Sequence, residues 1–423
     1  MSAHALWRQP QFRRFWTAQT ASELGDRISE LALPLIAITV LDASPGQVGP
    51  LTAAVWLPNL LSLFIGAWVD QRRRKRALMI AADLFRAVVL LTLPLAFWLG
   101  SMTLGHLYAV AILTGAAHVV FNTAYPAFFV RLVTREEYLD ANGKLSSTRS
   151  MSFIAGPAIG GLLVQWLRAP VALVADALTF LFSALQLSRI DVIEVAVDDA
   201  GEPLLRRARA GLRFVLQSRY LRASLGCATT LNFFGFFATA LVVLFASREL
   251  GLSAGTIGLA LGIGATGGLV GALVAPRLAQ RFPVGWVIAL GGVGFSGSVA
   301  IVALAGGPIW VRVGALAAAE FVGGFSIMCF DVPLNSLQAM VIPDFMRSRV
   351  AGAFSSINYG ARPLGAVLGG LLGEWIGIRP TLIISAAGGV FAIGWLIGSP
   401  ILGLRDLSSL DVLPEHAAAP PSG

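Results

Sequence analysis

The stretch "GPAIGGLLVQWLRAPVAL", residues 156–173, is repeated in altered form as "GAVLGGLLGEWIGIRPTL", residues 365–382. Both copies contain the pattern G-G-L-L-x-x-W, which begins at Gly160 in the first copy and at Gly369 in the second, 209 residues later. In a chain that spans a membrane, repeats of this kind are typical of transporters whose binding site lies between two related halves. The first prediction is therefore a chain built from two such halves.

The composition indicates a membrane protein. Of the 423 residues, 56% are hydrophobic and only 13% are charged, whereas a soluble domain has about 25% charged residues. So few charged side chains cannot cover a water-facing surface of this size. We therefore expect most of the surface to face lipid.

Twelve apolar stretches are long enough to cross a bilayer, which takes about 20 residues in a helix. Turn-forming sequences such as "DASPGQ" and "WLGSMTLG" separate them. The predicted spans are 15–41, 46–69, 76–99, 104–132, 146–167, 170–189, 222–247, 254–279, 284–305, 309–333, 349–376 and 379–403.

This pattern predicts an all-α polytopic membrane protein with twelve transmembrane helices in two pseudo-symmetric six-helix bundles. The N-terminal bundle covers residues 1–189 and the C-terminal bundle residues 222–403, with a cytoplasmic linker at 190–221. Residues 404–423 are expected to form a disordered cytoplasmic tail.

The second part of the linker is predicted to be an amphipathic helix. Its arginines lie opposite an apolar face formed by Leu204, Leu205, Ala208, Leu212, Val215 and Leu216. Such a helix can lie on the anionic surface of the membrane, or it can pack against the protein. Both interpretations remain open at this point.

The distribution of lysine and arginine predicts the orientation. Of the 31 such residues, only Arg168, Arg248, Arg312 and Arg379 fall in connections on one side, and Arg27 lies inside the first span. The others gather at the termini and in the connections on the opposite side, and positive loops stay in the cytoplasm. We therefore expect a multi-pass protein of the cytoplasmic (plasma) membrane with both termini in the cytoplasm.

Other classes of function lack support in the sequence. The net charge of +8 comes from short basic clusters between apolar runs, without the interleaved aromatics of a single-strand nucleic-acid binder. No H-E-x-x-H, G-x-S-x-G or P-loop pattern occurs, so we do not expect an enzyme. Cys227 and Cys329 lie in apolar runs without metal-ligand spacing. We expect no nucleic-acid partner, no metal and no cofactor.

A charged stripe interrupts the first span, in "SELGDRISE", residues 22–30. Helical spacing places four side chains on one face: Glu23, Asp26, Arg27 and Glu30. A charge facing lipid at the centre of a helix costs about 2.5–3.5 kcal/mol on insertion scales, so the stripe must face a wet cavity or partners on other helices. Three acids against one arginine predict an unbalanced negative site suited to binding protons or substrate. The alternative is a structural ion-pair network that holds the first helix to the second half.

Other ionisable residues also lie in predicted spans. Asp176 and Glu320 are further candidates for a proton or substrate site. His118 is interpreted as a hydrogen-bonded packing residue, with a proton relay as the alternative. Arg362 is expected near the cytoplasmic end, where it could be a partner for Asp70.

The segment "GAWVDQRRRKR", residues 66–76, follows the second span. It resembles the signature G-x-x-x-D-R-x-G-R-R/K of the major facilitator superfamily. The matching residues are Gly66, Asp70, Arg74 and Lys75, whereas Gln71 and Arg73 depart from the signature. The resemblance implies a cytoplasmic gate in which ion pairs bias the inward-facing against the outward-facing state. The alternative is a basic loop that only sets topology.

Further motifs narrow the resemblance to the branch that contains enterobactin-type siderophore exporters and macrolide efflux proteins. They cover nearly the whole chain and include "FRRFW", "WLPNLL", "AADLFRA", "NTAYPAFFVRLV", "ANGKLSS" and "GLRFV". Within "AADLFRA", Asp83 and Arg86 match a third-helix pair of that branch. They either extend the Asp70 cluster or form a local ion pair at a helix end.

The segment "SFIAGPAIGG", residues 152–161, is similar to the antiporter motif G-x-x-x-G-P-x-x-G-G of exporters in this superfamily. Ser152 replaces its first glycine, and the matching residues are Gly156, Pro157, Gly160 and Gly161. Small residues let helices approach closely and proline adds a bend. Ordinary helix packing is the alternative reading of this motif.

Together these features predict a secondary active transporter that exports small amphipathic or hydrophobic compounds, of drug or siderophore type, by alternating access and proton antiport. Its expected partners are a small-molecule substrate, protons and the lipid bilayer, and we expect a monomer. Alternatives are a facilitator or importer of a nutrient or lipid, a non-transporting receptor, and, more remotely, a membrane-embedded enzyme.

Overall fold

The computed structural model describes residues 5–134, 137–192, 204–343 and 346–406. After the short α1 (Ala5–Arg8), the first half contains α2 (Pro10–Thr39), α3 (Pro45–Trp56), η1 (Leu57–Leu61), α4 (Ser62–Asp70), α5 (Lys75–Trp98), α6 (Leu104–Leu132), α7 (Tyr138–Leu167) and α8 (Ala169–Ser188). The second half contains α10 (Arg219–Arg248), α11 (Ala254–Arg281), α12 (Val284–Ala303), α13 (Ile309–Val341), α14 (Arg347–Ile376), α15 (Ile378–Val390), η3 (Phe391–Ile393), α16 (Gly394–Ile397) and η4 (Pro400–Gly403).

Each predicted span corresponds to a helix or a run of consecutive helices. Within the described residues, nine of these segments are long and apolar enough to cross a membrane. The other three positions are occupied by α2, by the α3–η1–α4 run and by α14. The first of them carries the charged stripe, the second is interrupted, and α14 is rich in glycine and serine. The predicted class, an all-helical polytopic protein of two related halves, is confirmed.

The second span is not the continuous helix that the hydropathy pattern predicts. A 3-10 segment, η1, separates α3 from α4, and Pro58 lies within it. Proline has no backbone N–H and cannot continue the ladder of hydrogen bonds, so the axis breaks at this point. In the last span a second 3-10 segment, η3, separates α15 from α16 and contains no proline.

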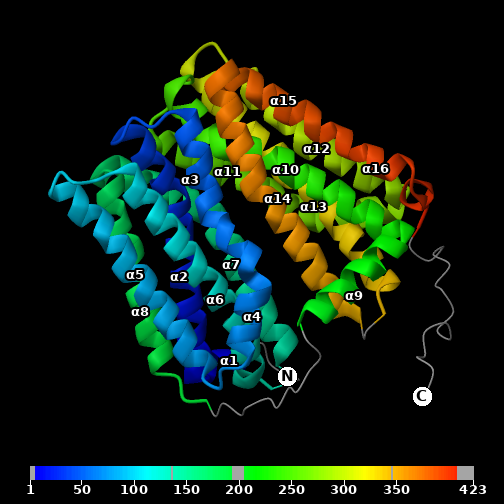
Figure 1. Ribbon diagram of the computed structural model, residues 1–423, viewed down its shortest axis with the longest axis horizontal. Helices are drawn as coiled ribbons and strands as arrows, with labels where there is room; N and C mark the ends of the chain where they lie inside the picture. Colours follow the sequence, from blue (N-terminus) through cyan, green and yellow to red (C-terminus); the bar gives the residue numbers. More distant parts are fainter. Residues whose placement is uncertain (1–4, 135–136, 193–203, 344–345, 407–423) are drawn as a thin grey trace.

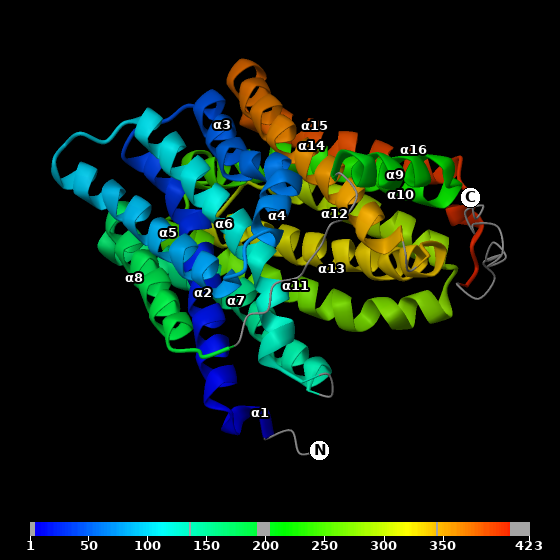
Figure 2. The same ribbon diagram turned by 60° about the horizontal axis from the view of Figure 1, so that its bottom comes forward.

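Two pairs of helices join the halves, α7 with α11 and α3 with α14 (Figure 1, Figure 2). Glycine allows the backbones to meet in both pairs: Gly161 faces Gly258, and Gly370 faces Gly49. An added Cβ would lie 2.8 Å from the Cα of Gly258 in the first pair and 2.7 Å from that of Gly49 in the second. The second pair repeats the first at the spacing of the sequence repeat. The repeat therefore describes a pseudo-symmetric interface.

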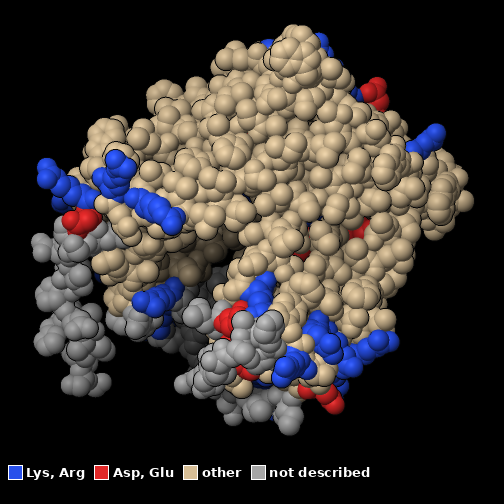
Figure 3. All heavy atoms as spheres, turned by 180° about the vertical axis from the view of Figure 1, so that it is seen from behind, with Lys and Arg blue, Asp and Glu red and all other residues tan. Residues whose placement is uncertain are grey.

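These contacts lie towards the C-terminal ends of α7 and α14. At the opposite end the halves diverge, and Figure 3 shows the surface hollowed between them. The molecule is thus joined at one end and open at the other.

The linker helix α9 (Leu204–Gln217) packs against α14. Val215 is fully buried in a cluster with Leu221, Met346 and Val350, and Gly211 lies against the backbone of Arg349. The helix therefore packs on the protein, which is one of its two interpretations.

Residues 404–406, the start of the predicted disordered tail, are described and contact α12. The carbonyls of Leu404 and Arg405 accept hydrogen bonds from the first two residues of α12, Gly285 and Val284. Residues 407–423, which make up the remainder of that prediction, lie outside the described residues.

Candidate functional site

Arg86 forms the centre of a buried charge network in the first half. Its side chain is 1% exposed and donates to Asp26 at 3.0 Å, to Ser22 at 3.3 Å, and to Asp83 on its own helix. Phe180 and Phe121 lie against its guanidinium, with ring centroids 4.1 and 5.1 Å from Cζ. A cation without water needs such compensation by acids and aromatic rings. The network therefore ties α2, α5, α6 and α8 together.

Asp26 has a second partner in His118 of α6, whose Nδ1 lies 3.3 Å from its Oδ2. The other ring nitrogen of His118 is 2.6 Å from Asn122. His118 is 44% exposed and Asp26 22%, so this pair reaches the surface of the half while Arg86 stays inside. The imidazole therefore contacts a candidate proton site.

The other three charges of the stripe also find partners within the first half. Arg27 and Glu30 form an ion pair of 2.5 Å, and Arg27 lies over the ring of Phe153 in α7. Glu23 accepts from Arg149 of α7 at 3.1 Å. Glu30 remains 52% exposed, which makes it the most accessible acid of the stripe.

The structure therefore contradicts one prediction about the stripe and one detail of its alternative. The stripe is not three acids against one arginine, because Arg86, Arg149 and His118 supply additional positive or polar partners from α5, α7 and α6. In the described part of the chain, the network joins α2 to its own half, not to the second half. Spacing along one helix could not reveal partners that arrive from three others.

Asp83 and Arg86 do form the local ion pair that was one of two interpretations, but its setting is unexpected. Asp83 is 0% exposed, so the pair is a core element that includes Asp26 and not a solvated helix end. The side chain of Asp70 lies outside the described residues, so an extension of the pair towards Asp70 stays a prediction.

Asp176 of α8 lies beside this network. Its carboxylate accepts hydrogen bonds from Ser29 of α2 and from Thr179, and the side chain is fully buried. Gly25 of α2 faces Asp176 and Thr179, where any side chain would overlap them. Asp26 of α2 and Asp176 of α8, two candidate acids of the sequence analysis, are thus neighbours where these helices pack together.

The antiporter-like motif packs α7 on α2 and on the second half. A Cβ on Gly156 would overlap the side chain of Arg27, and one on Gly160 would lie 3.3 Å from the Cα of Ile28. Gly161 instead meets Gly258 across the interface between the halves. Pro157 lies inside α7, and its carbonyl faces Gly258 as well. The motif therefore connects the charged stripe with the joined end.

The gate segment is only partly described. A Cβ added to Gly66 would lie 3.8 Å from Cγ2 of Thr123 in α6. Arg74 is exposed and precedes α5, and the buried Lys75 donates from Nζ to the carbonyl of Val69, closing the turn between α4 and α5. A gating role for Gly66, Asp70, Arg74 and Lys75 stays a prediction.

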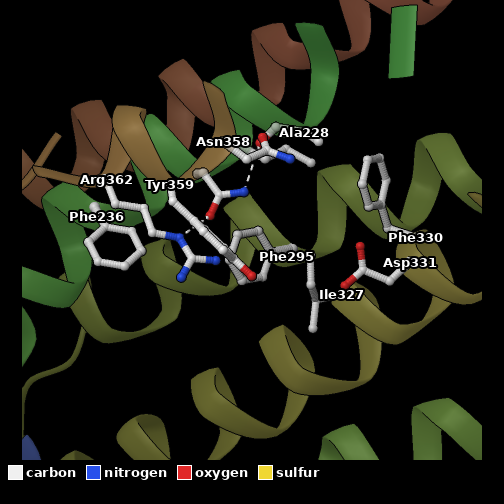
Figure 4. Close-up of a pocket in the computed structure, with 11 residues that line it drawn as sticks. Ala228, Phe236, Phe295, Ile327, Phe330, Asp331, Asn358, Tyr359 and Arg362 are labelled. Carbon is white, nitrogen blue, oxygen red and sulfur yellow. Dashed lines mark hydrogen bonds between the residues drawn. The ribbon is translucent and has the colours of Figure 1, made fainter. Parts of the chain in front are cut away.

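A cavity of about 370 Å³ lies in the second half, between α10, α12, α13 and α14 (Figure 4). Phenylalanines and aliphatic residues form most of its wall. Its polar lining residues are Asn232, Asp331, Asn358, Tyr359 and Arg362. This size and this mixture of apolar wall and few polar groups are typical of small-molecule sites.

Arg362 belongs to this cavity. Its Nε donates to Asn232 at 2.9 Å, and Trp56, Tyr359 and Phe236 surround its guanidinium. The expected position beside the cytoplasmic gate is therefore corrected to the middle of α14. Pairing with Asp70 stays a prediction, since that side chain is not described.

The sequence analysis missed Asp331, Asn232, Asn358 and Tyr359. Asp331 had the same signal that selected Glu320, an acid within an apolar span, in the stretch "CFDVP". Glu320 itself does not line the cavity; its Cβ faces Gly264 of α11, and we find no hydrogen bond or ion pair for it among the described residues. The better-supported acid of α13 is Asp331.

The joined end also carries a matched pair of hydrogen bonds between the halves. Gln165 of α7 accepts from the N–H of Gly255 at 2.9 Å, at the start of α11. At the equivalent place, Glu374 of α14 accepts from the N–H of Gly46 at 3.0 Å, at the start of α3. The first turn of a helix has unpaired N–H groups, so each acceptor caps a helix of the opposite half. Arg248 and Asp42 add an ion pair of 2.5 Å.

Removing these caps should loosen the joined end. We expect Gln165→Ala to shift the balance between joined and separated forms by up to about fivefold, because one exchanged hydrogen bond is worth about 1 kcal/mol. Glu374→Ala should act in the same direction, whereas Glu374→Gln should not, because glutamine already serves at the equivalent position. Spin labels on Gly105→Cys and Gly306→Cys, with Cys227 and Cys329 replaced by alanine, report the separation. Equal distance distributions for Gln165→Ala and the parent would contradict the capping role.

Comparison with known proteins agrees with this architecture. The profile of the family described as "Transmembrane secretion effector" (MFS_3) matches residues 1–421. The multidrug efflux pump Tap of Mycobacterium tuberculosis is 28% identical over 427 residues, covering 94% of this chain and 94% of that protein.

Two solved transporters share the fold. The nucleoside transporter NupG superposes with a TM-score of 0.73 at 13% identity, covering 92% of this chain and 98% of its own. A bacterial homolog of the human lysosomal transporter Spinster, in an inward-facing and occupied conformation, gives 0.72 at 14% identity, covering 92% and 97%. At these identities the likeness concerns the fold alone. With the family profile spanning nearly its whole length, the chain belongs to the transmembrane secretion effector family of major-facilitator transporters.

Proposed function

We propose that this protein is a secondary active exporter of small amphipathic or hydrophobic compounds that works by alternating access and proton antiport. One observation carries the proposal: the two halves are joined at one end, open at the other, and a partly polar cavity lies in the second half near the middle of α10 and α14. A site reached from one side at a time is what alternating access requires.

The direction of transport, out of the cell, is inferred from the relatives. Tap is named as a multidrug efflux pump, and the aromatic wall of the cavity suits apolar ring systems of several kinds. The concentration of lysine and arginine at the open end orients that end towards the cytoplasm. Substrate would then enter from the cytoplasm or the inner leaflet. Tags at both termini should accordingly be reachable only from the cytoplasmic side.

The first half supplies candidates for proton exchange. Asp26 connects the buried Arg86 with the half-exposed His118, and Glu30 pairs with Arg27 at the surface of the same helix. A proton that binds either acid would weaken an ion pair and change the charge balance beside the interface helix α7. Gly156 and Gly160 pack α7 directly on Arg27 and Ile28. Protonation of the stripe can therefore shift α7, which also forms the joined end.

The test is flux in everted membrane vesicles, whose cytoplasmic face is outward and whose lumen is acidic. Accumulation of a dye, a macrolide or a siderophore in the lumen, with release of protons from it, would support the proposal. Movement of substrate that ignores the pH gradient would indicate a facilitator. No movement of any compound, with folded protein in the membrane, would argue for a receptor.

Neutralising the acids should separate transport from the pH gradient. For Asp26→Asn and Glu30→Gln we expect at least a tenfold loss of pH-driven accumulation, while exchange of substrate across vesicles without a gradient persists. Protein amount should stay close to that of the parent, because each amide keeps one acceptor oxygen for its arginine and Arg86 also keeps its pair with Asp83. Glu249→Gln, at the far end of α10, is the matched control and should behave as the parent. Normal coupling in both acid variants would move the proton site to Asp176 or Glu320.

A further inference from the structure

The cavity contains two opposite charges that do not meet. Asp331 on α13 and Arg362 on α14 both line it, and Figure 4 shows them entering from different sides. Their charges interact electrostatically. Among the described residues, however, we find no ion pair between them and no hydrogen bond to the Asp331 carboxylate. A carboxylate and a guanidinium thus line the same cavity from separate helices.

The guanidinium of Arg362 is held firmly in place. Asn232 accepts a hydrogen bond from its Nε at 2.9 Å, and Cζ lies 4.3 Å from the ring centroid of Trp56 and 4.4 Å from that of Tyr359. Trp56 comes from α3 of the other half and also contacts Phe236 with a centroid distance of 5.4 Å. The rings lie close to the guanidinium, and among the described residues we find no hydrogen bond for its Nη donors, which are therefore left for a ligand. Such donors are suited to a carboxylate or phosphate.

Two unpaired charges in an aromatic cavity are costly when water is displaced from them. A ligand with one positive charge would satisfy Asp331 but would leave Arg362 without a counter-ion, and a ligand with one negative charge would do the reverse. Only a ligand that carries both signs removes both costs at once. Its apolar body would lie against the apolar lining residues Phe295, Phe330 and Ile327.

We propose that the cavity selects zwitterionic amphiphiles, with an ammonium group at Asp331, an anionic group at Arg362 and an aromatic body between them. This inference rests on the proposed function, because it names the chemical class that the exporter carries. The volume of about 370 Å³ accommodates a compound of two or three rings. Singly charged and neutral compounds of the same shape are the weaker ligands.

A matched series of biphenyls tests this selectivity with the purified full-length protein in detergent. The parent probe carries an aminomethyl group on one ring and a carboxylate on the other. Hydroxymethyl replaces the amine, and carboxamide the carboxylate, to give the anionic, cationic and neutral members. Calorimetric titration should find the zwitterion bound at least about tenfold more tightly than either singly charged member, the difference expected for one charge-assisted hydrogen bond.

Two variants assign the charges. In Asp331→Asn the zwitterion should bind no better than the anionic member, and in Arg362→Gln no better than the cationic member. The neutral member should keep its affinity in both, which shows that the cavity is intact. Glu249→Gln and the exposed Arg277→Gln remove one charge each outside the cavity, and both should retain the parent's order of affinities.

Equal affinities across the four biphenyls, or no binding of the zwitterion, would overturn the inference. So would a tenfold preference that survives in both cavity variants. These outcomes are distinct from failure of the export function. Dye accumulation driven by the pH gradient can persist without zwitterion selectivity. Selective binding without flux of any compound would instead refute export and leave the ligand class standing.

Discussion

Arg86→Leu is expected to abolish most of the folded protein. Arg86 is 1% exposed and pairs with Asp83, which is 0% exposed, and with Asp26. Removing one partner of a buried pair costs about 3–5 kcal/mol, because the remaining charge has neither water nor a counter-ion. Since four helices of the first half meet at this side chain, their packing should fail together. The measurement is the monodisperse fraction and the unfolding temperature after extraction in mild detergent.

Two variants make this result specific. Arg149→Gln removes an arginine that is 53% exposed, and it should lower the unfolding temperature only slightly, as exposed pairs contribute about 0–1 kcal/mol. Asp83→Leu combined with Arg86→Leu should recover part of the lost stability, because the uncompensated carboxylate is gone. A stable Arg86→Leu protein with a normal unfolding temperature would show that the network does not hold the first half together.

Gly161→Leu should separate the halves at the joined end and reduce accumulation of substrate at least tenfold. Any Cβ at this position meets the carbonyl of Ala254 at 2.6 Å and the Cα of Gly258 at 2.8 Å. Backbone atoms cannot yield as the end of a flexible side chain can, so α7 and α11 must move apart. Gly370→Leu should have a similar effect through Gly49, which occupies the equivalent place in the repeat. Vesicle accumulation and the label distance between Gly105→Cys and Gly306→Cys report the two consequences.

Gly314→Leu is the matched control. Gly314 lies in α13 with no atom within 4 Å of an added Cβ, so the same substitution there should leave both readouts near the parent values. Full activity of both Gly161→Leu and Gly370→Leu would contradict the requirement for a tightly joined end.

The helices and the repeat could be predicted because they depend on local composition. Apolar runs of spanning length, separated by turn residues, indicate helices whatever surrounds them. The spacing of the repeat also predicts which glycines correspond, and Gly161 and Gly370 do occupy equivalent contacts. Pro58 also indicates the break in the second span, but the mean hydropathy of a whole span does not reveal a single proline.

The partners of charged residues could not be predicted from spacing on one helix. Asp26 meets Arg86 and His118 from helices that begin far along the chain, and only the tertiary arrangement brings them together. Arg362 illustrates the same limit, because its position relative to the membrane was inferred from its distance to a helix end, whereas Asn232 and Trp56 hold it in the cavity. Asp331 carried a sufficient signal and was overlooked beside Glu320.

Alternating access is tested most directly by measuring distances at both ends of the same molecule. One label pair, Gly105→Cys with Gly306→Cys, reports the joined end, and a second, Ser188→Cys with Gln280→Cys, reports the open end at the exposed termini of α8 and α11. Under acidification with substrate present, the first distance should lengthen while the second shortens, in the same fraction of molecules. If both distances stay constant while vesicles accumulate substrate, or if one distance changes without the other, alternating access is contradicted.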